Sequence, residues 1–533
     1  MTRSLSDLAR TVPGATVSGD VSVQIQDIQY DSRLVTPGAL FVALRGGYVD
    51  GHDFIQSALD RGAVAVIVDR TIDLDVPAIH VADSRSALSP ISAAFFGHPS
   101  HKLQVVGITG TDGKTTTSYL ADAILSHAGI VTGVIGTVSV KIAEQVVQHE
   151  TRQTTPESME IQRLLAQMVD AGVETAILEA TSHGLAQHRL DDVDFSVGAV
   201  TNITHEHLEF HKTIAAYRAA KATLFDRVAS RNGIAVVNLD DEGAQAVLPH
   251  AAGATVLRYS CLDRDAEIFA SNIDISVDGT SFDLALGGTT VSMRSPLIGQ
   301  FNVENALAAI GIARAMGLDI KEIAAGLATA PAIPGRMQRV DEGQPFSVIV
   351  DYAHTPESLQ KLLVLLRSLS PTSRIIAVSG SAGERDVPKR ALQGGVSARL
   401  ADFSVFTNED PRFEDAETII GQIADGAIAA GATPGVDFLT IVERRDAIAA
   451  ALERAQPGDI VLLAGKGHER SIIWNGEKIP WDEPAVAAQL LNALGYVRAA
   501  RSLSTFGLSD SPTSTSCCSS IGEGASNIKS TPR

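Results

Sequence analysis

Residues 107–117 read GITGTDGKTTT, and this stretch decides the fold class of the middle of the chain. It joins an apolar segment, QVVGITG (104–110), to TTTSYLADAILSHAG (115–129), whose apolar spacing is helical. A strand, a glycine turn and a helix place backbone N–H groups and the helix N-terminus around a phosphate. We therefore predict a nucleotide-binding loop in which Lys114 contacts the β- and γ-phosphates and the Thr115 hydroxyl ligates Mg²⁺.

The glycines of this loop miss the common phosphate-loop pattern, G-x-x-x-x-G-K-[ST], by one residue. That pattern needs glycine where Ile108 stands, and the glycines are Gly107 and Gly110 instead. An ordinary glycine-rich connection between a strand and a helix is the alternative interpretation. The run GKTTT directly after an apolar strand favours the phosphate loop.

Length and composition predict several domains and exclude some classes of partner. A chain of 533 residues, 45% of them hydrophobic, exceeds one core and can fill several. The net charge of −19 disfavours a nucleic-acid or acidic-membrane surface. Cys261, Cys517 and Cys518 lack metal-site spacing, and no apolar run suits a signal peptide or a membrane span. We expect a cytoplasmic monomer without nucleic-acid or membrane partners.

Strands and helices alternate along most of the chain, which is typical of α/β domains with mostly parallel sheets. PAIPGR (331–336) interrupts the alternation with two prolines and a glycine, so we place a boundary and a hinge there. After about residue 498 the chain is rich in Ser, Thr, Gly and Pro, and we expect disorder. The predicted units are a mixed α/β domain (1–100), a central parallel-sheet domain (101–332), a Rossmann-like α/β domain (333–498) and a tail (499–533).

Three more residues of the central segment are candidates for chemistry. Glu179 ends the apolar strand ETAILEA, where open α/β sheets bind ligands, although a solvated cap is the commoner role. His207 lies in TNITHEHLEFH, and a zinc-protease reading fails because Glu209 stands where the second histidine is needed. Helical periodicity alone makes Lys221, in AYRAAKATLF, an ordinary surface lysine.

A series of motifs, in order over about residues 20–495, resembles the Mur ligase family. The family loop, G-x-x-G-T-x-G-K-[ST], fits Gly107 to Thr115 in full, which explains the displaced glycine. The segments DSR, DGHDFI, HLEFH and AGKGHE are most similar to the members that add the third residue of the peptidoglycan stem peptide. Further matches are PGALFVALRG, TTPE, EATSHGL, QHRL, IPGRMQRV, DYAHTPESL, GERD and EDPR.

The resemblance implies a role for each of several groups of residues. The expected contacts to the uridine nucleotide are Tyr30, Ser32, Gly47, Tyr48 and Val49. The expected contacts to the muramoyl dipeptide are Thr154, Thr155, Thr181, Gln187 and Arg189. The expected contacts to ATP are Gly110, Thr111, Asp112, Gly113, Lys114, Thr115, Thr116, Asn302, Arg336 and Asp351. The expected amino-acid site consists of Arg385, Glu409, Asp410, Pro411, Arg412, Gly465 and Glu469.

The same resemblance implies the metal site and the chemistry. Thr115, Glu179 and His207 would ligate Mg²⁺, and Lys114, His207 and Lys221 would be catalytic. Lys221 aligns with the lysine that family members carbamylate with CO₂, so N6-carboxylysine replaces the surface-lysine interpretation. The implied reaction is the ADP-forming, ATP-dependent ligation of a free diamino acid to UDP-N-acetylmuramoyl-L-alanyl-D-glutamate through an acyl phosphate.

Three departures from the family pattern bear on function. Asp112 for Asn and Thr181 for Ser are conservative. EDPR (409–412) stands where diaminopimelate-adding members read DNPR, and Asp410 adds a negative charge that should attract a bare ammonium. We therefore favour L-lysine or L-ornithine, with meso-diaminopimelate open. A phosphate-loop phosphotransferase, an inactive binding module, and ligases that add D-alanyl-D-alanine or D-glutamate rank lower.

Overall fold

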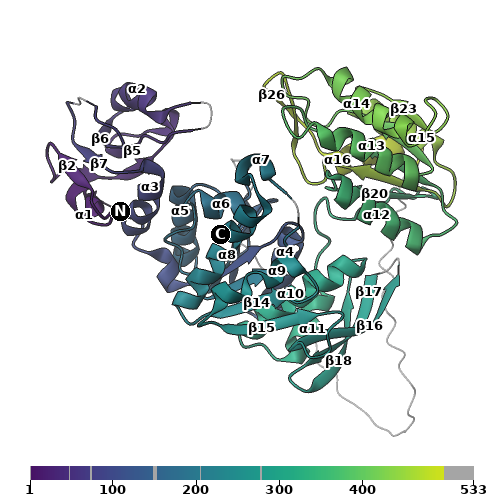
Figure 1. Cartoon of the computed structure of the whole chain (residues 1–533), viewed down its shortest axis with the longest axis horizontal. Helices are drawn as coiled ribbons and strands as arrows, with labels where there is room; N and C mark the ends of the chain where they lie inside the picture. Colours follow the sequence, from purple (N-terminus) through teal and green to yellow (C-terminus); the bar gives the residue numbers. More distant parts are fainter. Residues whose placement is uncertain are drawn as a thin grey trace, which may run out of the picture.

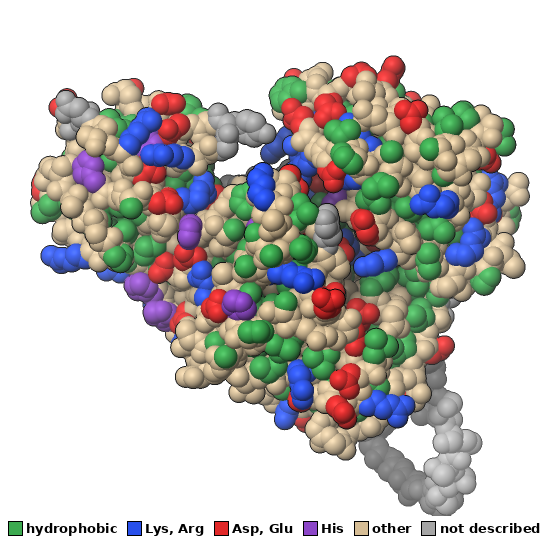
Figure 2. Space-filling model, in the orientation of Figure 1, with side chains coloured by type: hydrophobic (Ala, Val, Ile, Leu, Met, Phe, Trp, Pro, Cys, Tyr) green, Lys and Arg blue, Asp and Glu red, His purple; other side chains and the backbone are tan. Residues whose placement is uncertain are grey.

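The structure is a computed structural model that describes residues 2–46, 49–72, 75–147, 153–204, 206–276 and 279–496 of the chain. Figure 1 shows three lobes in chain order: the N-terminal lobe at the upper left, the central lobe below and the C-terminal lobe at the upper right. On the face seen in Figure 2, a notch separates the two upper lobes, and acidic and basic side chains are interspersed. Of the helices in the described ranges, none has the length and apolar character to cross a membrane.

The N-terminal lobe contains a five-stranded sheet in the order β2-β7-β6-β5-β4, parallel except for β2. Its strands are β2 (Thr16–Ser18), β4 (Asp27–Gln29), β5 (Ala39–Val42), β6 (Ala63–Val68) and β7 (Ala78–His80). Its helices are α1 (Leu5–Ala9), α2 (Ile55–Asp60) and α3 (Ser84–Phe95), and β1 (Arg3–Ser4) pairs with β3 (Gln24–Ile25). The β-branched run of β6 is almost fully buried, which is typical of a parallel strand covered on both faces.

The central lobe is built on an eleven-stranded sheet in the order β11-β10-β9-β12-β8-β13-β14-β15-β16-β17-β18. The strands that flank the phosphate loop are β8 (Gln104–Thr109), β12 (Thr175–Glu179) and β13 (Val197–Val200). The other strands are β9 (Thr132–Ile135), β10 (Val140–Ile142), β11 (Gln145–Val147), β14 (Ile234–Asn238), β15 (Thr255–Ser260), β16 (Ile268–Ser276), β17 (Gly279–Leu286) and β18 (Thr289–Ser295). Because β8 pairs in parallel with both neighbours, their carboxyl ends lie together at one edge.

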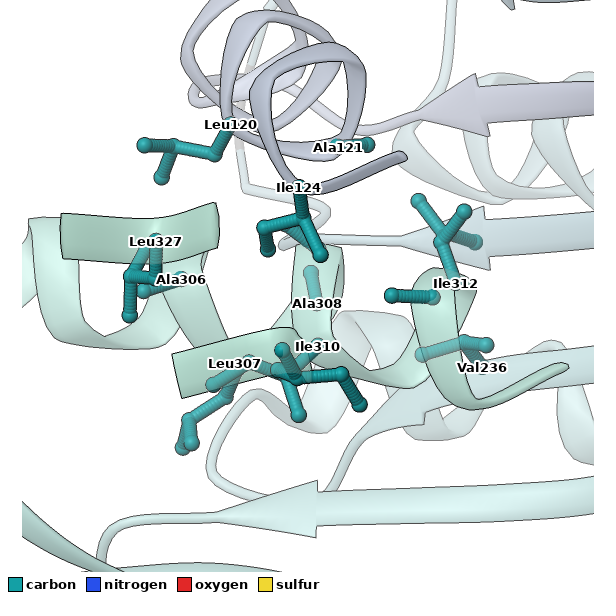
Figure 3. Packing of buried hydrophobic residues seen from close by; sticks show 14 of the residues in the cluster. Leu120, Ala121, Ile124, Val236, Ala306, Leu307, Ala308, Ile310, Ile312 and Leu327 are labelled. Atoms are coloured by element: carbon teal, nitrogen blue, oxygen red, sulfur yellow. The ribbon is translucent and has the colours of Figure 1, made fainter. Parts of the chain in front are cut away.

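Helices cover both faces of the central sheet. They are α4 (Lys114–His127), α5 (Ser158–Asp170), α6 (Ser182–Ala186), α7 (Leu208–His211), α8 (Ile214–Ser230), α9 (Glu242–Gln245), α10 (Gln300–Ala315) and α11 (Ile320–Ala328). Figure 3 shows Leu120 and Ile124 of α4 packed against Ile310 of α10 and Leu327 of α11. Each such fully buried side chain contributes about 1.5–3 kcal/mol, so this core fixes α4 and the loop that precedes it.

Both ends of the central sheet differ from the predicted parallel arrangement. Strands β16, β17 and β18 form an antiparallel extension at one end, and β10 and β11 form another at the opposite end. The stretch IFASNIDIS in β16 alternates between less and more exposed residues. That two-residue period is the signal in the sequence that predicts a strand with one solvated face.

The C-terminal lobe has a six-stranded sheet in the order β19-β20-β24-β21-β22-β23, parallel except for β19. Its strands are β19 (Gln338–Val340), β20 (Ser347–Asp351), β21 (Ile375–Ser379), β22 (Phe403–Phe406), β23 (Phe438–Thr440) and β24 (Ile460–Ala464), with a separate hairpin of β25 (Ser471–Trp474) and β26 (Glu477–Pro480). Its helices are α12 (Pro356–Leu369), α13 (Pro388–Leu400), α14 (Ala416–Ala429), α15 (Arg444–Arg454) and α16 (Glu483–Ala493).

The predicted break at residues 331–336 contains neither helix nor strand and connects α11 to β19. The predicted tail, with Cys517 and Cys518, lies outside the described residues. The three-domain α/β architecture that we predicted is confirmed by the solved structures compared below, whereas the domain limits that we gave stay predictions.

Candidate active site

The phosphate loop has a backbone that glycine alone adopts without strain. Gly110 and Gly113 have φ values of 154° and 85°, and Lys114 begins α4 directly afterwards. A Cβ atom on Gly113 would collide with the side-chain amide of Asn305, and one on Gly110 would collide with the hydroxyl of Thr201. The two glycines therefore allow α10 and the end of β13 to pack against the loop.

Two lysine side-chain amines converge on this loop. Nζ of Lys114 donates to the carbonyl oxygens of Gly110 and Thr111, at 2.8 Å each. Nζ of Lys221 donates to the carbonyl oxygen of Gly110 at 2.7 Å. The helix α8, which carries Lys221, thus places a second amine beside the loop that we predicted to bind phosphate.

The interpretation of Lys221 as a surface lysine is wrong, because the side chain is 1% exposed. Its Nζ lies 4.7 Å from the ring centre of Tyr217. Burial, followed by the charge of Lys114, lowers the pKa of Lys221 well below its usual value. The lowered pKa favours the neutral amine, which is the form that attacks CO₂.

Glu179 lies at the carboxyl end of β12, is 2% exposed, and is therefore not a solvated cap. The Thr115 hydroxyl donates to its Oε2 at 3.0 Å, and the Thr137 hydroxyl donates to the same oxygen at 2.8 Å. The backbone N–H of Thr137 donates to Oε1 at 2.9 Å. Threonine hydroxyls and a carboxylate are the hard oxygen donors that Mg²⁺ prefers, and Mg²⁺ usually keeps several waters, so Thr115 and Glu179 fit this metal.

His207 is placed differently from these two residues. It has a left-handed φ of 55°, and its ring nitrogens lie 3.3 Å from Oε1 of Glu209 and 3.6 Å from Oε2 of Glu206. Within the described residues, no group of three or more His, Cys, Asp or Glu side chains is arranged to hold a metal. The metal-ligand role that we predicted for His207 stays a prediction, and its strained backbone marks a position held by its surroundings.

The residues predicted to contact the muramoyl dipeptide form one hydrogen-bonded group beside Glu179. The hydroxyls of Thr155 and Thr181 lie 2.8 Å apart, and Thr154 lies 3.0 Å from the Thr137 hydroxyl. Arg189 donates to the carbonyl oxygen of Thr155 at 2.8 Å and to the side chain of Gln187 at 2.7 Å. Residues from three separate segments therefore meet at one edge of the sheet.

A cavity of about 760 Å³ lies between the central and C-terminal lobes, and it contains most of the predicted site. The predicted residues among its walls are Thr111, Asp112, Gly113, Lys114, Thr115, Thr116, Thr154, Thr181, His207, Asn302, Arg336, Asp351, Arg385, Glu409, Asp410, Arg412 and Glu469. Asp351 accepts backbone hydrogen bonds from Met337 at 2.7 Å and Ala353 at 2.8 Å, and burial raises its pKa.

The predicted amino-acid site has a charge arrangement that the sequence did not show. Asp410 accepts from Nζ of Lys466 at 2.9 Å and from the backbone N–H of Ile473 at 2.8 Å. Lys466 is completely buried and also contacts Glu469. The negative charge that Asp410 adds is therefore offset by a buried ammonium, and the choice of the added amino acid stays a prediction.

Arg444 is a buried residue that contacts both loops of this amino-acid site. Its guanidinium donates to the carbonyl oxygen of Asn408 at 3.1 Å and to that of Ala464 at 2.9 Å. It also pairs with the fully buried Glu483 at 2.5 Å. Both loops of the site, which begin at Glu409 and Gly465, are thereby tied to one buried ion pair.

The predicted uridine-nucleotide residues lie apart from the cavity, on the N-terminal lobe. Tyr30 donates to Oε1 of Glu160 at 2.7 Å, and Ser32 is 7% exposed at the start of a short 3₁₀ turn. Val49 is 55% exposed. Gly47 and Tyr48 lie outside the described residues.

The sequence did not predict several residues that line the cavity. Glu206 lies next to His207; burial acts to raise its pKa, but the charges of His207, Lys114, His354 and Lys221 together lower it. Other missed residues of the cavity wall are Asn202, Asn305, Tyr352, His354 and Lys389. Tyr352 and His354 belong to the quoted motif DYAHTP, which is the signal that could have found them, whereas nothing in the sequence around Lys389 marks it.

A glycine-rich phosphate loop that opens into a cavity between two α/β lobes defines a nucleotide-dependent enzyme whose substrates meet between domains. Three family models match the chain: "Mur ligase family, catalytic domain" over 24–96, "Mur ligase middle domain" over 108–313, and "Mur ligase, glutamate ligase domain" over 335–467.

Known proteins resemble the chain over most of its length. The UDP-N-acetylmuramyl-tripeptide synthetase of Roseiflexus sp. is 46% identical, over 89% of this chain and 96% of its own. The UDP-N-acetylmuramoyl-L-alanyl-D-glutamate–2,6-diaminopimelate ligase of Geobacillus thermodenitrificans is 40% identical, over 91% and 98%. A solved structure of a ligase with the same name has a TM-score of 0.64 at 30% identity and covers 93% of this chain and 100% of its own.

The chain belongs to the Mur ligase family. Mur ligases are ATP-dependent enzymes of peptidoglycan synthesis that form amide bonds and use Mg²⁺, and this chain is such a ligase. The MurF ligase from Thermotoga maritima, solved with ADP, shares the fold with a TM-score of 0.58 at 20% identity.

Proposed function

We propose that this ligase adds L-lysine or L-ornithine to UDP-N-acetylmuramoyl-L-alanyl-D-glutamate. The names of the relatives at 46% and 40% identity support the nucleotide-linked dipeptide as the acceptor. The charge of the amino-acid site carries the choice of the added residue: the carboxylates of Glu409, Asp410 and Glu469 meet at one end of the cavity. One buried ammonium, Lys466, contacts two of them.

The proposed reaction proceeds through an acyl phosphate. A carboxylate oxygen of the substrate's D-glutamate attacks the γ-phosphorus of ATP, the bond to the bridging oxygen breaks, and ADP leaves. The amino nitrogen of the diamino acid then attacks the acyl carbon, phosphate leaves with the C–O electron pair, and the nitrogen loses a proton. The first step joins two anions, so Lys114 acts by offsetting negative charge and by positioning.

The central residues divide this work. Gly110, Thr111, Asp112, Gly113 and Thr116 would surround the phosphates, while Asn302, Arg336 and Asp351 would contact the rest of ATP. Mg²⁺, held by Thr115 and Glu179 with His207 nearby, would supply further positive charge at the phosphates. Thr154, Thr155, Thr181, Gln187 and Arg189 would hold the dipeptide, and the N-terminal Tyr30, Ser32 and Gly47 to Val49 would hold the uridine nucleotide.

We infer that Lys221 acts as N6-carboxylysine. Its neutral amine would attack CO₂ and lose a proton, which converts a buried base into an anion. Such an anion would change the partners available to Lys114 and to Mg²⁺ beside the Gly110 carbonyl. The burial of Lys221 and its lowered pKa support this role.

The preference for lysine or ornithine rests on one carboxylate oxygen of the amino-acid site. Among the described residues, Oε2 of Glu409 is buried without a hydrogen-bond partner. A bare terminal ammonium supplies the hydrogen-bond donor that such an oxygen lacks. Pro411 and Gly465 would shape this end of the site, and Glu469 would bind an amino group.

The second candidate is meso-diaminopimelate, which carries an extra distal carboxylate. Arg385 and Arg412 line the same cavity, and Nε of Arg412 is buried without a hydrogen-bond partner among the described residues. A guanidinium is a good bidentate partner of a carboxylate, and one of the two could hold the α-carboxylate common to all three amino acids. The diaminopimelate-adding relatives at 40% identity also favour this candidate.

The test is ligation with UDP-N-acetylmuramoyl-L-alanyl-D-glutamate, ATP and each diamino acid separately, with the product mass and ADP measured together. We expect turnover with lysine or ornithine and much less with diaminopimelate. Turnover with diaminopimelate alone would overturn the charge argument. ADP release without amide product in every case would overturn the proposed ligation and favour a phosphotransferase.

A further inference from the structure

A completely buried lysine, Lys466, lies inside the amino-acid site, where it contacts two carboxylates. It follows Gly465 at the end of β24, and its side chain has no exposed surface. Its Nζ lies 2.9 Å from Oδ1 of Asp410 and also contacts Oε2 of Glu469. A buried ammonium is tolerated only when paired, so these contacts hold it in place.

Asp410 is oriented toward this lysine from the other loop of the site. Its Oδ1 also accepts the backbone N–H of Ile473 at 2.8 Å, which fixes the carboxylate on the side of Lys466. The two loops that carry Asp410 and Lys466 follow β22 and β24 and are anchored by Arg444. The pair is therefore a fixed feature of the site and not a chance meeting of mobile side chains.

The other two carboxylates of the site, Glu469 and Glu409, differ in whether Lys466 contacts them. Glu469 lines the cavity while it shares Lys466, and burial raises its pKa. Glu409 is buried with Oε2 unpaired among the described residues, and a Cβ atom on Gly465 would lie 3.3 Å from that oxygen. The net charge that an incoming amino acid meets thus depends on Lys466 as much as on any single carboxylate.

We propose that Lys466 is a specificity-determining residue, whose ammonium cancels the charge of Asp410 so that the pair sets the preference between a distal ammonium and a distal carboxylate. This inference rests on the proposed ligation of a diamino acid. Position 410 alone does not set the preference: aspartate there with Lys466 present leaves the pair neutral.

Substitutions change the charge of the pair in a known direction. Asp410→Asn leaves Lys466 with one carboxylate fewer and makes the site more positive by one unit. Lys466→Met, which keeps an unbranched chain of similar length, makes it more negative by one unit. The double variant restores the charge of the wild-type pair without the ion pair itself.

The experiment measures kcat/KM for lysine and for meso-diaminopimelate with the wild type and these three variants. We expect Asp410→Asn to shift the ratio toward diaminopimelate by about tenfold and Lys466→Met to shift it toward lysine by about tenfold. The double variant should return within about threefold of the wild-type ratio. Lys466→Arg keeps the charge and should hold the wild-type ratio more closely than Lys466→Met does.

The decisive comparison is Asp410→Asn against the double variant. A double variant that keeps the ratio of Asp410→Asn would overturn the role of Lys466, and this holds even if Lys466→Met alone does not fold. The KM values for ATP and for the nucleotide-linked dipeptide should stay near wild type, because a merely structural defect would raise all three. A wild-type enzyme that ligates none of the diamino acids refutes the proposed function instead, which separates the two failures.

Discussion

The two boundaries of the central lobe differ in how they are held. At the N-terminal boundary, Arg85 pairs with Glu157 at 2.9 Å, Arg163 pairs with Asp27 at 2.9 Å, and Met159 of α5 lies within the N-terminal hydrophobic core. The C-terminal boundary contains the large cavity. Charged side chains on the two sides of this boundary act on each other without direct contact. Burial raises the pKa of Glu304, for example, and the charge of Lys361 acts to lower it.

We infer from this difference that substrates meet, and the lobes close around them, at the second boundary. Direct packing and ion pairs join the N-terminal lobe to the central sheet. A boundary with a large cavity, lined by the residues that we propose to bind phosphate and the amino acid, has room for substrates and for closure around them. The segment 331–336 lies at this second boundary, and Gly335 there packs against the loop at Gly467. Five predictions test the comparison, beginning with the largest effect.

Lys114→Met should reduce kcat about 10²- to 10³-fold, because the γ-phosphate then lacks the positive charge that offsets its reaction with a carboxylate. ADP formation and amide product, measured together, should fall in parallel. The thermal midpoint should stay near wild type. The exposed Lys321→Met is the matched control and should keep full activity; unchanged turnover in Lys114→Met would remove the loop from the mechanism.

Lys221→Ala should lower kcat about 100-fold if the carbamate supplies one charged contact at the phosphates. Acetate or formate should partly restore activity, because a small carboxylate can occupy the vacated space. Rescue that is equal in Lys114→Met would indicate a general salt effect and not replacement of the carbamate.

The same lysine gives a pH prediction with a definite sign. Because burial lowers the pKa of Lys221, the reactive neutral amine persists to lower pH than in an exposed lysine. With ¹³C-bicarbonate, the carbamate NMR signal should be present at neutral pH and disappear on acidification through that lowered pKa. A signal that appears only near pH 10 would contradict the burial argument.

Arg85→Met should destabilise the protein by about 1.5–3 kcal/mol, the usual contribution of hydrogen bonds to a charged group, and leave kcat largely unchanged. Glu157 keeps Arg189 at 3.0 Å, which limits the loss. Urea unfolding monitored by circular dichroism measures the effect. A loss of turnover with no loss of stability would mean that the N-terminal boundary also takes part in the reaction.

Lys361→Met, its counterpart at the second boundary, should change stability by no more than about 0.5 kcal/mol, since its side chain is exposed and its charge is screened. The same urea titration compares it directly with Arg85→Met. Equal destabilisation by both substitutions would remove the distinction between the two boundaries.

Much of the fold could be predicted because its signals are local. The apolar run before Gly110 and the helical spacing after Lys114 give β8 and α4 nearly to the residue. The antiparallel strands β16 to β18 were missed although their alternation is visible, since the surrounding rhythm favoured a parallel sheet. The sequence did not single out Glu206, because the neighbouring His207 was the residue of that motif with a recognisable role. The proximity of Glu206 to Lys114 and Lys221 depends on three elements that are far apart in sequence.

The sequence by itself determined the family and predicted the phosphate loop, since both depend on residue types at fixed spacing. The tertiary structure alone decided which charged side chains are buried and which are paired with an opposite charge. Helical periodicity assigns Lys221 to a face of α8 but does not say that the phosphate loop covers that face. Likewise, Asp410 and Lys466 are 56 residues apart, and only the parallel pairing of the C-terminal strands brings them to one edge, where each cancels the charge of the other.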